Sequence, residues 1–379
     1  MKFNLVVPVR SLWLALIGLI ATFGAATVQA EPYLAVQNGY KCVQCHVNPT
    51  GGGLRTQFGL VFAEKSLPVY RLPAGAPVWL GQAISDIVRV GGDLRTDYFD
   101  RSIPHERSQN GFQLEQLRLY ADVTLLPNLL GLYVDEQVAP DGASNMETYA
   151  RLGSQSKWYV KAGQFYLPFG WRLQDQSAFT REFSLVSMAT PDRGVELGLE
   201  RGKWSAQLDI TNGTVGLNNG VLQESKNGRQ VTINVVRTES IWRVGASALY
   251  RHSDLGNRNE AALYAGLRTG PVVWLTEADL IHQNDLGTPG APGPSTTTIP
   301  AFIEADWLIY RGNNLKLTYD YLDPQRRSNG NGQSRWSAVY ELTPYPFVQL
   351  RAGVRRYSGP SEIDPDNLAL TFAELHLFL

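Results

Sequence analysis

Apolar and polar residues alternate along most of the chain, from about residue 83 to the C-terminus. The alternation is clearest in residues 118–124, 205–210, 316–321 and 349–355, where one set of positions is apolar and the other carries charged, amide or glycine residues. Successive side chains of a β-strand point to opposite faces, so the pattern predicts a sheet with one apolar and one polar face. It is typical of strands in outer-membrane barrels, whose apolar face contacts lipid and whose polar face lines the lumen.

About sixteen such segments follow one another, and the links between them alternate in length. The segments begin near residues 84, 112, 129, 146, 157, 193, 203, 229, 240, 259, 271, 299, 313, 334, 345 and 367. Seven links are short turns and eight are longer, as in outer-membrane barrels with short periplasmic turns and longer outer loops. Residues 81–379 are therefore predicted to be all-β: an antiparallel transmembrane outer-membrane β-barrel of about 16 strands with both termini in the periplasm. The alternatives are 14 or 18 strands, or a soluble sandwich.

Aromatic residues near the predicted strand ends support a membrane barrel. Several apolar positions close to strand ends are aromatic, and an amphipathic ring is favoured there at a bilayer interface. They are Trp158, Trp204, Trp242, Trp274, Trp307, Trp336, Tyr250 and Tyr340. The last segment runs to the end of the chain, as barrel closure requires of a terminal strand that pairs with the first.

The N-terminus has the features of an export signal. Lys2 and Arg10 precede an almost wholly apolar stretch, residues 12–28, which ends in the small-residue sequence Val28-Gln29-Ala30. This pattern predicts a secretory signal peptide of residues 1–30, cut after Ala30, with an uncleaved membrane anchor as the alternative.

Residues 31–80 form a short segment between the predicted signal peptide and the predicted barrel. The segment is rich in Gly and Pro and shows little of the alternation expected of strands. Leu54, Phe58, Val61 and Phe62 fall at helical spacing and predict one short helix with an apolar stripe. About 50 residues is few for an independent core. We therefore expect this segment to insert into the lumen as a plug, with residues 71–78 as the linker to the barrel.

Composition excludes several classes of protein. The chain of 379 residues has 34 basic and 35 acidic residues, so its net charge of −1 argues against a nucleic-acid binder. Its 18% of charged residues is below the roughly 25% of soluble domains. Two cysteines cannot form a disulfide-rich scaffold, and 44% of hydrophobic residues is too many for a disordered chain.

Both cysteines lie in the sequence Cys42-Val43-Gln44-Cys45-His46. This is the C-x-x-C-H spacing of c-type haem attachment, in which two thiols add to the haem vinyl groups and the adjacent imidazole is the proximal iron ligand. A redox dithiol and half of a zinc site are the alternatives, but the chain lacks a thioredoxin-like context and a second Cys or His pair. The sequence predicts one covalent haem c on Cys42, Cys45 and His46, in a monohaem cytochrome c-like segment of residues 31–80.

The second axial ligand of such a haem has two candidates. His376 lies near the end of the last strand, close to the periplasmic rim, and its parity matches that of the polar face. Met188 lies on the longest link, residues 167–192. The competing interpretation of His376 is a rim histidine that contacts no haem.

The N-terminal segment resembles the fused monohaem cytochrome–porins, a family that includes outer-membrane iron oxidases. Ala30, Pro32, Ala35, Gln37 and Gly39 precede the C-x-x-C-H motif at the family's spacing, and Leu34, Val36 and Asn38 replace the family's residues. Downstream, Pro49, Leu54, Phe58-Gly59 and Phe62 echo the family pattern, whereas Gly51–Gly53 is an insertion. Residues 161–170 and 209–213 of the barrel look like phosphate-selective porin strands, and in general porins a loop equivalent to residues 167–192 folds inward.

This resemblance implies a function in electron transfer. It implies an outer-membrane cytochrome–porin that passes electrons between an extracellular donor or acceptor, with Fe(II) as the family's donor, and a periplasmic cytochrome or other electron carrier. Oxidation of Fe(II) would make the protein an iron(II):cytochrome oxidoreductase; no catalytic residue is predicted. The alternative is a solute-selective porin with a structural or regulatory haem. Outer-membrane lipid is a further expected partner, and nucleic acid is not.

Overall fold

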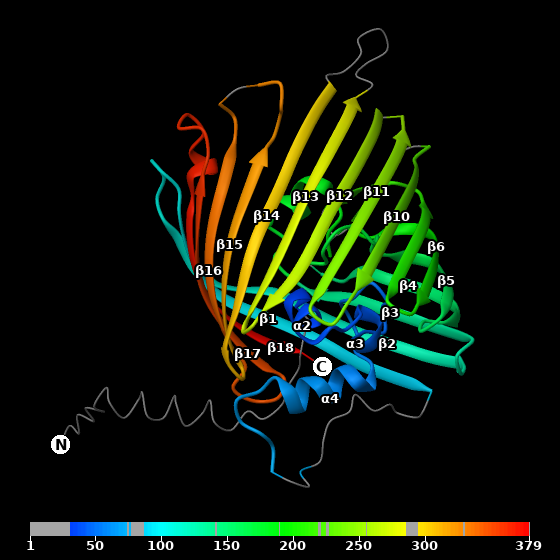
Figure 1. Ribbon diagram of the computed structural model, residues 1–379. Coiled ribbons are helices and arrows are strands. Elements are labelled where there is room, and N and C mark those ends of the chain that lie inside the picture. Colours follow the sequence, from blue (N-terminus) through cyan, green and yellow to red (C-terminus); the bar gives the residue numbers. More distant parts are fainter. Residues whose placement is uncertain are drawn as a thin grey trace, which may run out of the picture.

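The computed structural model describes residues 31–73, 76, 87–140, 142–188, 190–218, 221–224, 227–254, 256–285, 295–328 and 330–378. The predicted signal peptide of residues 1–30 and the predicted boundary between residues 80 and 81 lie outside these residues. Sixteen strands form one closed antiparallel barrel, which confirms the predicted fold class (Figure 1). The strands are β1 (Val88–Ser102), β2 (Gln109–Leu126), β3 (Leu130–Ala139), β4 (Ser144–Ser154), β5 (Trp158–Phe165), β6 (Asp192–Arg201), β7 (Trp204–Thr211), β10 (Arg229–Thr238), β11 (Trp242–Ser253), β12 (Gly256–Thr269), β13 (Val272–Asp285), β14 (Ser295–Tyr310), β15 (Asn313–Asp323), β16 (Gln333–Leu342), β17 (Val348–Ser358) and β18 (Ala369–Phe378).

The barrel closes between its first and last strands. β1 pairs with β18 over ten positions, from Asp93 opposite Phe378 to Ser102 opposite Ala369. Every other strand pairs with its neighbour in the chain, except that β7 pairs directly with β10. The intervening link, predicted as an irregular loop, contains a separate two-stranded hairpin of β8 (Thr214–Asn218) and β9 (Val221–Glu224).

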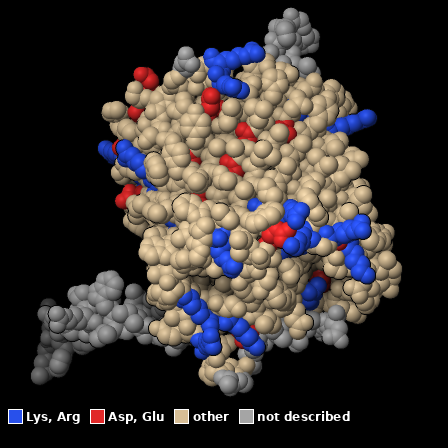
Figure 2. All heavy atoms as spheres, in the orientation of Figure 1, with Lys and Arg blue, Asp and Glu red and all other residues tan. Residues whose placement is uncertain are grey.

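Alternation along each strand separates an apolar exterior from a polar interior. In β10, Val231, Ile233 and Val235 are exposed, whereas Thr232 and Asn234 are buried. Large apolar side chains on the exterior would be costly in water and are favoured in lipid. Seven of the eight predicted aromatic positions follow this rule, because their residues are between 39% and 63% exposed. The eighth, Trp242, is half-buried. The visible face of the barrel is mainly uncharged (Figure 2).

The N-terminal residues lie inside the barrel at the end that carries the short turns (Figure 1). They form α2 (Pro32–Asn38), α3 (Cys42–Cys45) and α4 (Gln57–Ser66). Tyr33, Leu34 and Val36 of α2 belong to a buried apolar cluster with residues from the wall, among them Val236 and Leu275. Among the described residues, no helix is both long enough and apolar enough to cross a lipid bilayer.

Hydrogen bonds tie the same segment to the short turns. Arg268 donates to the carbonyl of Gln37 at 2.7 Å, and Arg311 donates to the carbonyl of Pro68 at 2.6 Å. Lys41 donates to Glu200 at 2.7 Å, next to the turn between β6 and β7. Three separate turns therefore hold the helices at one mouth of the barrel.

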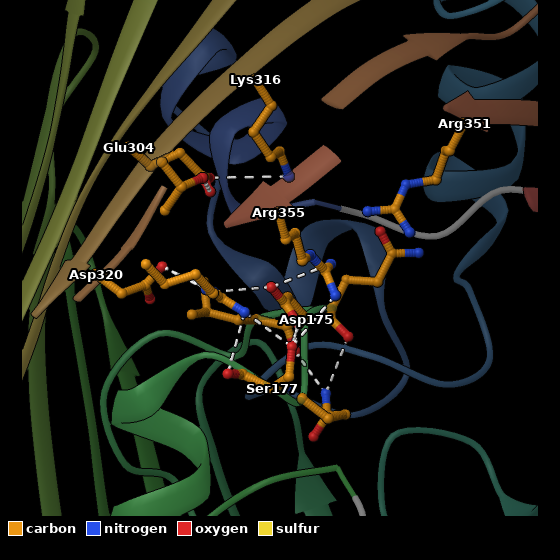
Figure 3. A network of polar contacts seen from close by, with 12 residues as sticks. Asp175, Ser177, Glu304, Lys316, Asp320, Arg351 and Arg355 are labelled. Atoms are coloured by element: carbon orange, nitrogen blue, oxygen red, sulfur yellow. Dashed lines mark hydrogen bonds and ion pairs between the residues drawn. The ribbon is translucent and has the colours of Figure 1, made fainter. Parts of the chain in front are cut away.

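The link of residues 166–191 also folds into the lumen and includes α5 (Phe179–Ser184). Asp175 forms ion pairs with Arg335 at 3.0 Å and Arg355 at 3.2 Å, and it accepts a hydrogen bond from Ser177 at 2.6 Å (Figure 3). Arg181 forms a buried ion pair with Glu277. The longest link is thus fixed to the wall by charged side chains.

The predicted short helix exists, but only part of its apolar stripe is buried, and the rest is exposed. α4 begins after Thr56, whose hydroxyl accepts a hydrogen bond from the N–H of Gly59 at 3.1 Å and so caps the helix. Leu60 and Ala63 are buried, whereas Phe58 is 45% exposed. The buried face is therefore rotated away from Phe58.

Candidate functional site

The two cysteines lie on one short turn of helix. Cys42 and Cys45 are the first and last residues of α3, and both are free and half-buried. Residues three apart in a helix are neighbours on one face, so the two thiols share a side. His46 follows with extended backbone angles of φ −119° and ψ 145°, and it forms a β-bridge with Arg55. The chain therefore turns out of the helix at the imidazole.

His46 is a buried polar side chain whose ring lies near the backbone of Gly52 and Gly53. Its side chain is 2% exposed, and neither ring nitrogen has a hydrogen-bond partner of normal geometry among the described residues. Burial, helped by the charge of Arg55, lowers the pKa of His46 to about 3, against the opposing effect of the backbone at Gly53 and Gly52. The ring is therefore neutral at physiological pH, which is the form that binds a metal. Buried polar atoms without partners are uncommon and call for an explanation.

A cavity opens beside these residues. Its empty space, including the part open to solvent, amounts to about 1210 Å³. Cys42, Cys45 and His46 all line it. Most of the remaining wall is apolar or aromatic and includes Tyr40, Phe62, Leu167, Phe169, Trp171 and Tyr264.

Glycines allow the backbone to approach closely around this cavity. Gly51, Gly52 and Gly53 all have positive φ angles, and a Cβ on Gly53 would lie 2.1 Å from the hydroxyl oxygen of Tyr133. A Cβ on Gly59 would lie 2.2 Å from the carbonyl oxygen of Cys45. The glycine insertion after the C-x-x-C-H motif thus fits a tight loop, and Gly59 lets α4 pack against α3.

Residues of the barrel wall complete the site. Arg243 of β11 is buried, approaches Cys42 Sγ with Nη1 at 3.4 Å, and lies 5.3 Å from the ring centre of Trp171. Burial, followed by the nearby Cys42, raises the pKa of Cys45 to about 11, so this thiol is protonated at neutral pH. No local sequence pattern could show this contact, because Arg243 and Cys42 are about 200 residues apart in the chain.

The two candidates for a second axial ligand lie in different places. Met188 lines the cavity, and its Cε would be 3.2 Å from a Cβ built on Gly52. His376 points inward and is fully buried, but it is not among the described residues that line the cavity. Its Nε2 is 2.9 Å from Asp93 Oδ2, and its Nδ1 is 3.0 Å from Gln349 Oε1. Met188 therefore lines the same cavity as the cysteines, whereas the ring of His376 is hydrogen-bonded to residues of the barrel wall.

The donor set can accommodate a covalently attached haem. It offers two thiols on one side, a neutral imidazole with free nitrogens, and a thioether on the same cavity. Over the part of the chain that the structure describes, no three His, Cys, Asp or Glu residues are grouped so as to hold a bare metal ion.

A closed barrel of sixteen antiparallel strands with a long link folded into the lumen defines a porin-type β-barrel. No protein-family model and no curated protein sequence matches the chain. Solved structures do match its fold. One is an anion-selective porin from Comamonas acidovorans, with 12% identity and a TM-score of 0.60 over 77% of this chain and 99% of that chain.

Two further barrels give similar values. OmpT, an outer membrane protein of Vibrio cholerae folded in vitro, has 9% identity and a TM-score of 0.58, covering 78% of this chain and 98% of its own. OprB of Pseudomonas putida has 6% identity and a TM-score of 0.55, and the match covers 77% of this chain and 94% of OprB. At such low identity the comparison establishes the fold, that of outer-membrane porins.

Proposed function

We propose that the protein is an outer-membrane cytochrome–porin that moves electrons across the outer membrane through one haem c. Cys42 and Cys45 attach the haem, His46 is its proximal ligand and Met188 its distal ligand. One observation carries the proposal: the buried imidazole of His46 makes no hydrogen bond of normal geometry and lies with both cysteines on a cavity inside the barrel.

A bound haem supplies a one-electron Fe(II)/Fe(III) couple. His46 would hold the iron through a ring nitrogen, and the thioether of Met188, which lines the same cavity, would be a second ligand. The aromatic wall and the link of residues 166–191 limit access of water, and burial is one of the factors that set a haem potential. The short turns would lie in the periplasm and the longer links outside, so that the haem serves a periplasmic electron carrier at one mouth and an extracellular donor or acceptor at the other.

The resemblance to the fused monohaem cytochrome–porins favours Fe(II) as the extracellular donor, which would make the protein an iron(II):cytochrome oxidoreductase. Cell fractionation combined with haem staining tests the location and the cofactor together. We expect one covalent haem in the outer-membrane fraction, and its reduction when Fe(II) is added anaerobically to the purified protein. Haem in the soluble periplasmic fraction, or a purified barrel without haem, would contradict the proposal.

A solute-selective porin with a structural or regulatory haem is the second candidate, because the solved structures that share the fold include an anion-selective porin. The two segments inside the lumen argue against a wide channel. Swelling of liposomes that contain the protein separates the candidates: permeable liposomes, together with a haem that no donor reduces, would favour the porin.

A further inference from the structure

The two ends of the barrel differ in charge. At the short-turn end, the seven turns, the two residues on either side of each, and the N-terminal segment contain nine Lys and Arg that are exposed or half-buried. They are Lys41, Lys65, Arg71, Lys157, Arg201, Lys203, Arg237, Arg268 and Arg311. Among the described residues of this end, the acidic side chain that is not buried is Glu239. We call these nine residues the basic rim, and Figure 2 shows Lys and Arg atoms along this lower edge.

The opposite end has no such excess. Its described links, with the two residues on either side of each, carry eight acidic and seven basic side chains that are exposed or half-buried. They are Glu106, Asp175, Glu182, Asp254, Asp323, Glu362, Asp364 and Asp366, against Arg101, Arg107, Arg172, Arg193, Arg229, Arg326 and Arg327. The strong positive charge therefore belongs to the end at which the N-terminal helices lie.

Most of the basic rim is not neutralised by the protein. Lys41 pairs with Glu200, and Lys203 and Arg237 share the single carboxylate of Glu239, so three of the nine cations have an acidic partner. Arg268 and Arg311 donate to backbone carbonyls, which leaves their charges uncompensated. Burial, followed by the charge of Arg71, lowers the pKa of Arg311, as expected of cations gathered together. Clustered charge of one sign steers oppositely charged partners over long distances.

An aromatic surface lies within the same end. Phe58 is 45% exposed and packs edge-to-face on Tyr40, with ring centres 5.2 Å apart. Tyr40 packs in turn on Phe62 at 5.9 Å, and both Tyr40 and Phe62 line the cavity. A continuous set of aromatic rings therefore connects this surface with the cavity that holds Cys42 and Cys45. An apolar centre inside a charged rim is the usual anatomy of a protein interface.

We propose that the short-turn end is the docking surface for an acidic redox protein, which exchanges electrons with the haem across the Tyr40–Phe58–Phe62 cluster. This proposal rests on the proposed function and adds the charge of the partner. Lipid phosphates would suit cations on the outer wall. Lys41, Lys65 and Arg71 instead belong to the N-terminal segment, whose helices lie at the mouth of the barrel and not on its outer wall, so the geometry favours a protein partner (Figure 1).

The test uses the haem-loaded protein in nanodiscs of neutral lipid. Plant plastocyanin serves as the acidic probe and mitochondrial cytochrome c as the basic one. In each reaction one electron leaves the reduced haem iron, which becomes Fe(III), and reduces Cu(II) to Cu(I) or the probe's Fe(III) to Fe(II). Stopped-flow absorbance gives the second-order rate constant. We expect the rate constant with plastocyanin to fall at least about tenfold between low salt and about 0.3 M salt, and the rate constant with cytochrome c to rise.

Charge reversal locates the surface. Lys157→Glu with Arg201→Glu, and separately Lys65→Glu with Arg71→Glu, should lower the plastocyanin rate constant about tenfold at low salt. The matched control, Arg326→Glu with Arg327→Glu, changes two exposed arginines at the other end and should leave the rate constant unchanged.

Three outcomes would overturn the proposal. In the first, ferricyanide oxidises the haem normally, but the rate constant with plastocyanin does not change with salt or in either rim variant. This result would refute the docking surface and leave the proposed function intact. Rim variants that react normally with plastocyanin but bind less tightly to vesicles containing phosphatidylglycerol would assign the basic rim to lipid. A protein that carries no haem removes the proposed function and the docking surface together.

Discussion

Two segments occupy the lumen, and they are held there in different ways. The link of residues 166–191 is attached by charges: Asp175 bridges Arg335 and Arg355, and Arg181 pairs with Glu277 (Figure 3). The N-terminal segment is attached by apolar packing of α2 and by hydrogen bonds from the rim to its backbone.

The two segments also differ in whether a buried polar side chain has a charged partner in the protein. A charge inside a barrel is tolerated when an opposite charge meets it, and Asp175 meets two. The ring of His46 is more deeply buried than Asp175 and meets none. The proposed haem would supply a partner for this ring.

The largest expected effect comes from the cysteines. Replacing Cys42→Ser and Cys45→Ser together should abolish covalent haem, because both thioether bonds are lost. The measurement is haem staining in a denaturing gel, with the intact mass as a second readout. Heat-dependent mobility should show that the barrel still folds; retained stain would refute the attachment site.

A smaller effect is expected at His46. His46→Ala should leave haem attached through the thiols but convert its absorption spectrum from low-spin to high-spin, because one axial ligand is missing. Added imidazole should restore the low-spin spectrum by filling the space. A variant whose spectrum equals that of the wild type would show that His46 is not the proximal ligand.

Met188 and His376 provide a matched pair. Met188→Leu keeps the side-chain volume but removes the sulfur, so it should alter the low-spin spectrum and the reduction potential. His376→Gln should leave both unchanged, because the ring of His376 is engaged by Asp93 and Gln349. If His376→Gln altered the spectrum and the potential and Met188→Leu did not, His376 would be the distal ligand.

The smallest effect concerns the ionic attachment of the link. Asp175→Asn should lower the free energy of unfolding by about 1–3 kcal/mol, since it leaves buried arginine donors poorly paired. Exposed Asp364, paired with His105 on the surface, is the control: Asp364→Asn should cost no more than about 0.5 kcal/mol. Denaturant titration in detergent, followed by tryptophan fluorescence, measures both; equal effects would remove the distinction between them.

The effect of Asp175 should depend on pH. Burial alone would raise its pKa, but Arg335 and Arg355 outweigh burial and hold the pKa well below the ordinary value of 3.8. A lowered pKa in the folded state stabilises the protein above the unfolded value and stops doing so as pH falls through the folded value. The difference between wild type and Asp175→Asn should therefore be constant near neutral pH and shrink below about pH 4. A difference that grew in acid would refute this ion-pair account.

Most of the barrel could be predicted from the sequence, because the alternation of apolar and polar residues along a strand is a local property. β10 and β15 begin at the predicted residues 229 and 313. β17 begins at Val348 rather than near 345, since Pro346 cannot donate to a ladder and Phe347 has a positive φ of 74°. The hairpin of β8 and β9 was missed because its strands are only five and four residues long.

The candidate site was only partly predictable. The C-x-x-C-H motif is contiguous, so its residues could be found from spacing alone. Arg243 and Met188 reach the cavity only through strand register and the path of the long link, which no local pattern encodes. His376 was correctly predicted to face inward, but its partner Asp93 lies on the first strand, 283 positions away.

The pairing of β1 with β18 also constrains how the protein is assembled. A ring of strands is complete only when the strand made last meets the strand made first, and here ten residue pairs form that seam. The wall therefore cannot close before β18 is available to pair with β1, so closure of the ring depends on the two ends of the strand order and on no strand between them alone.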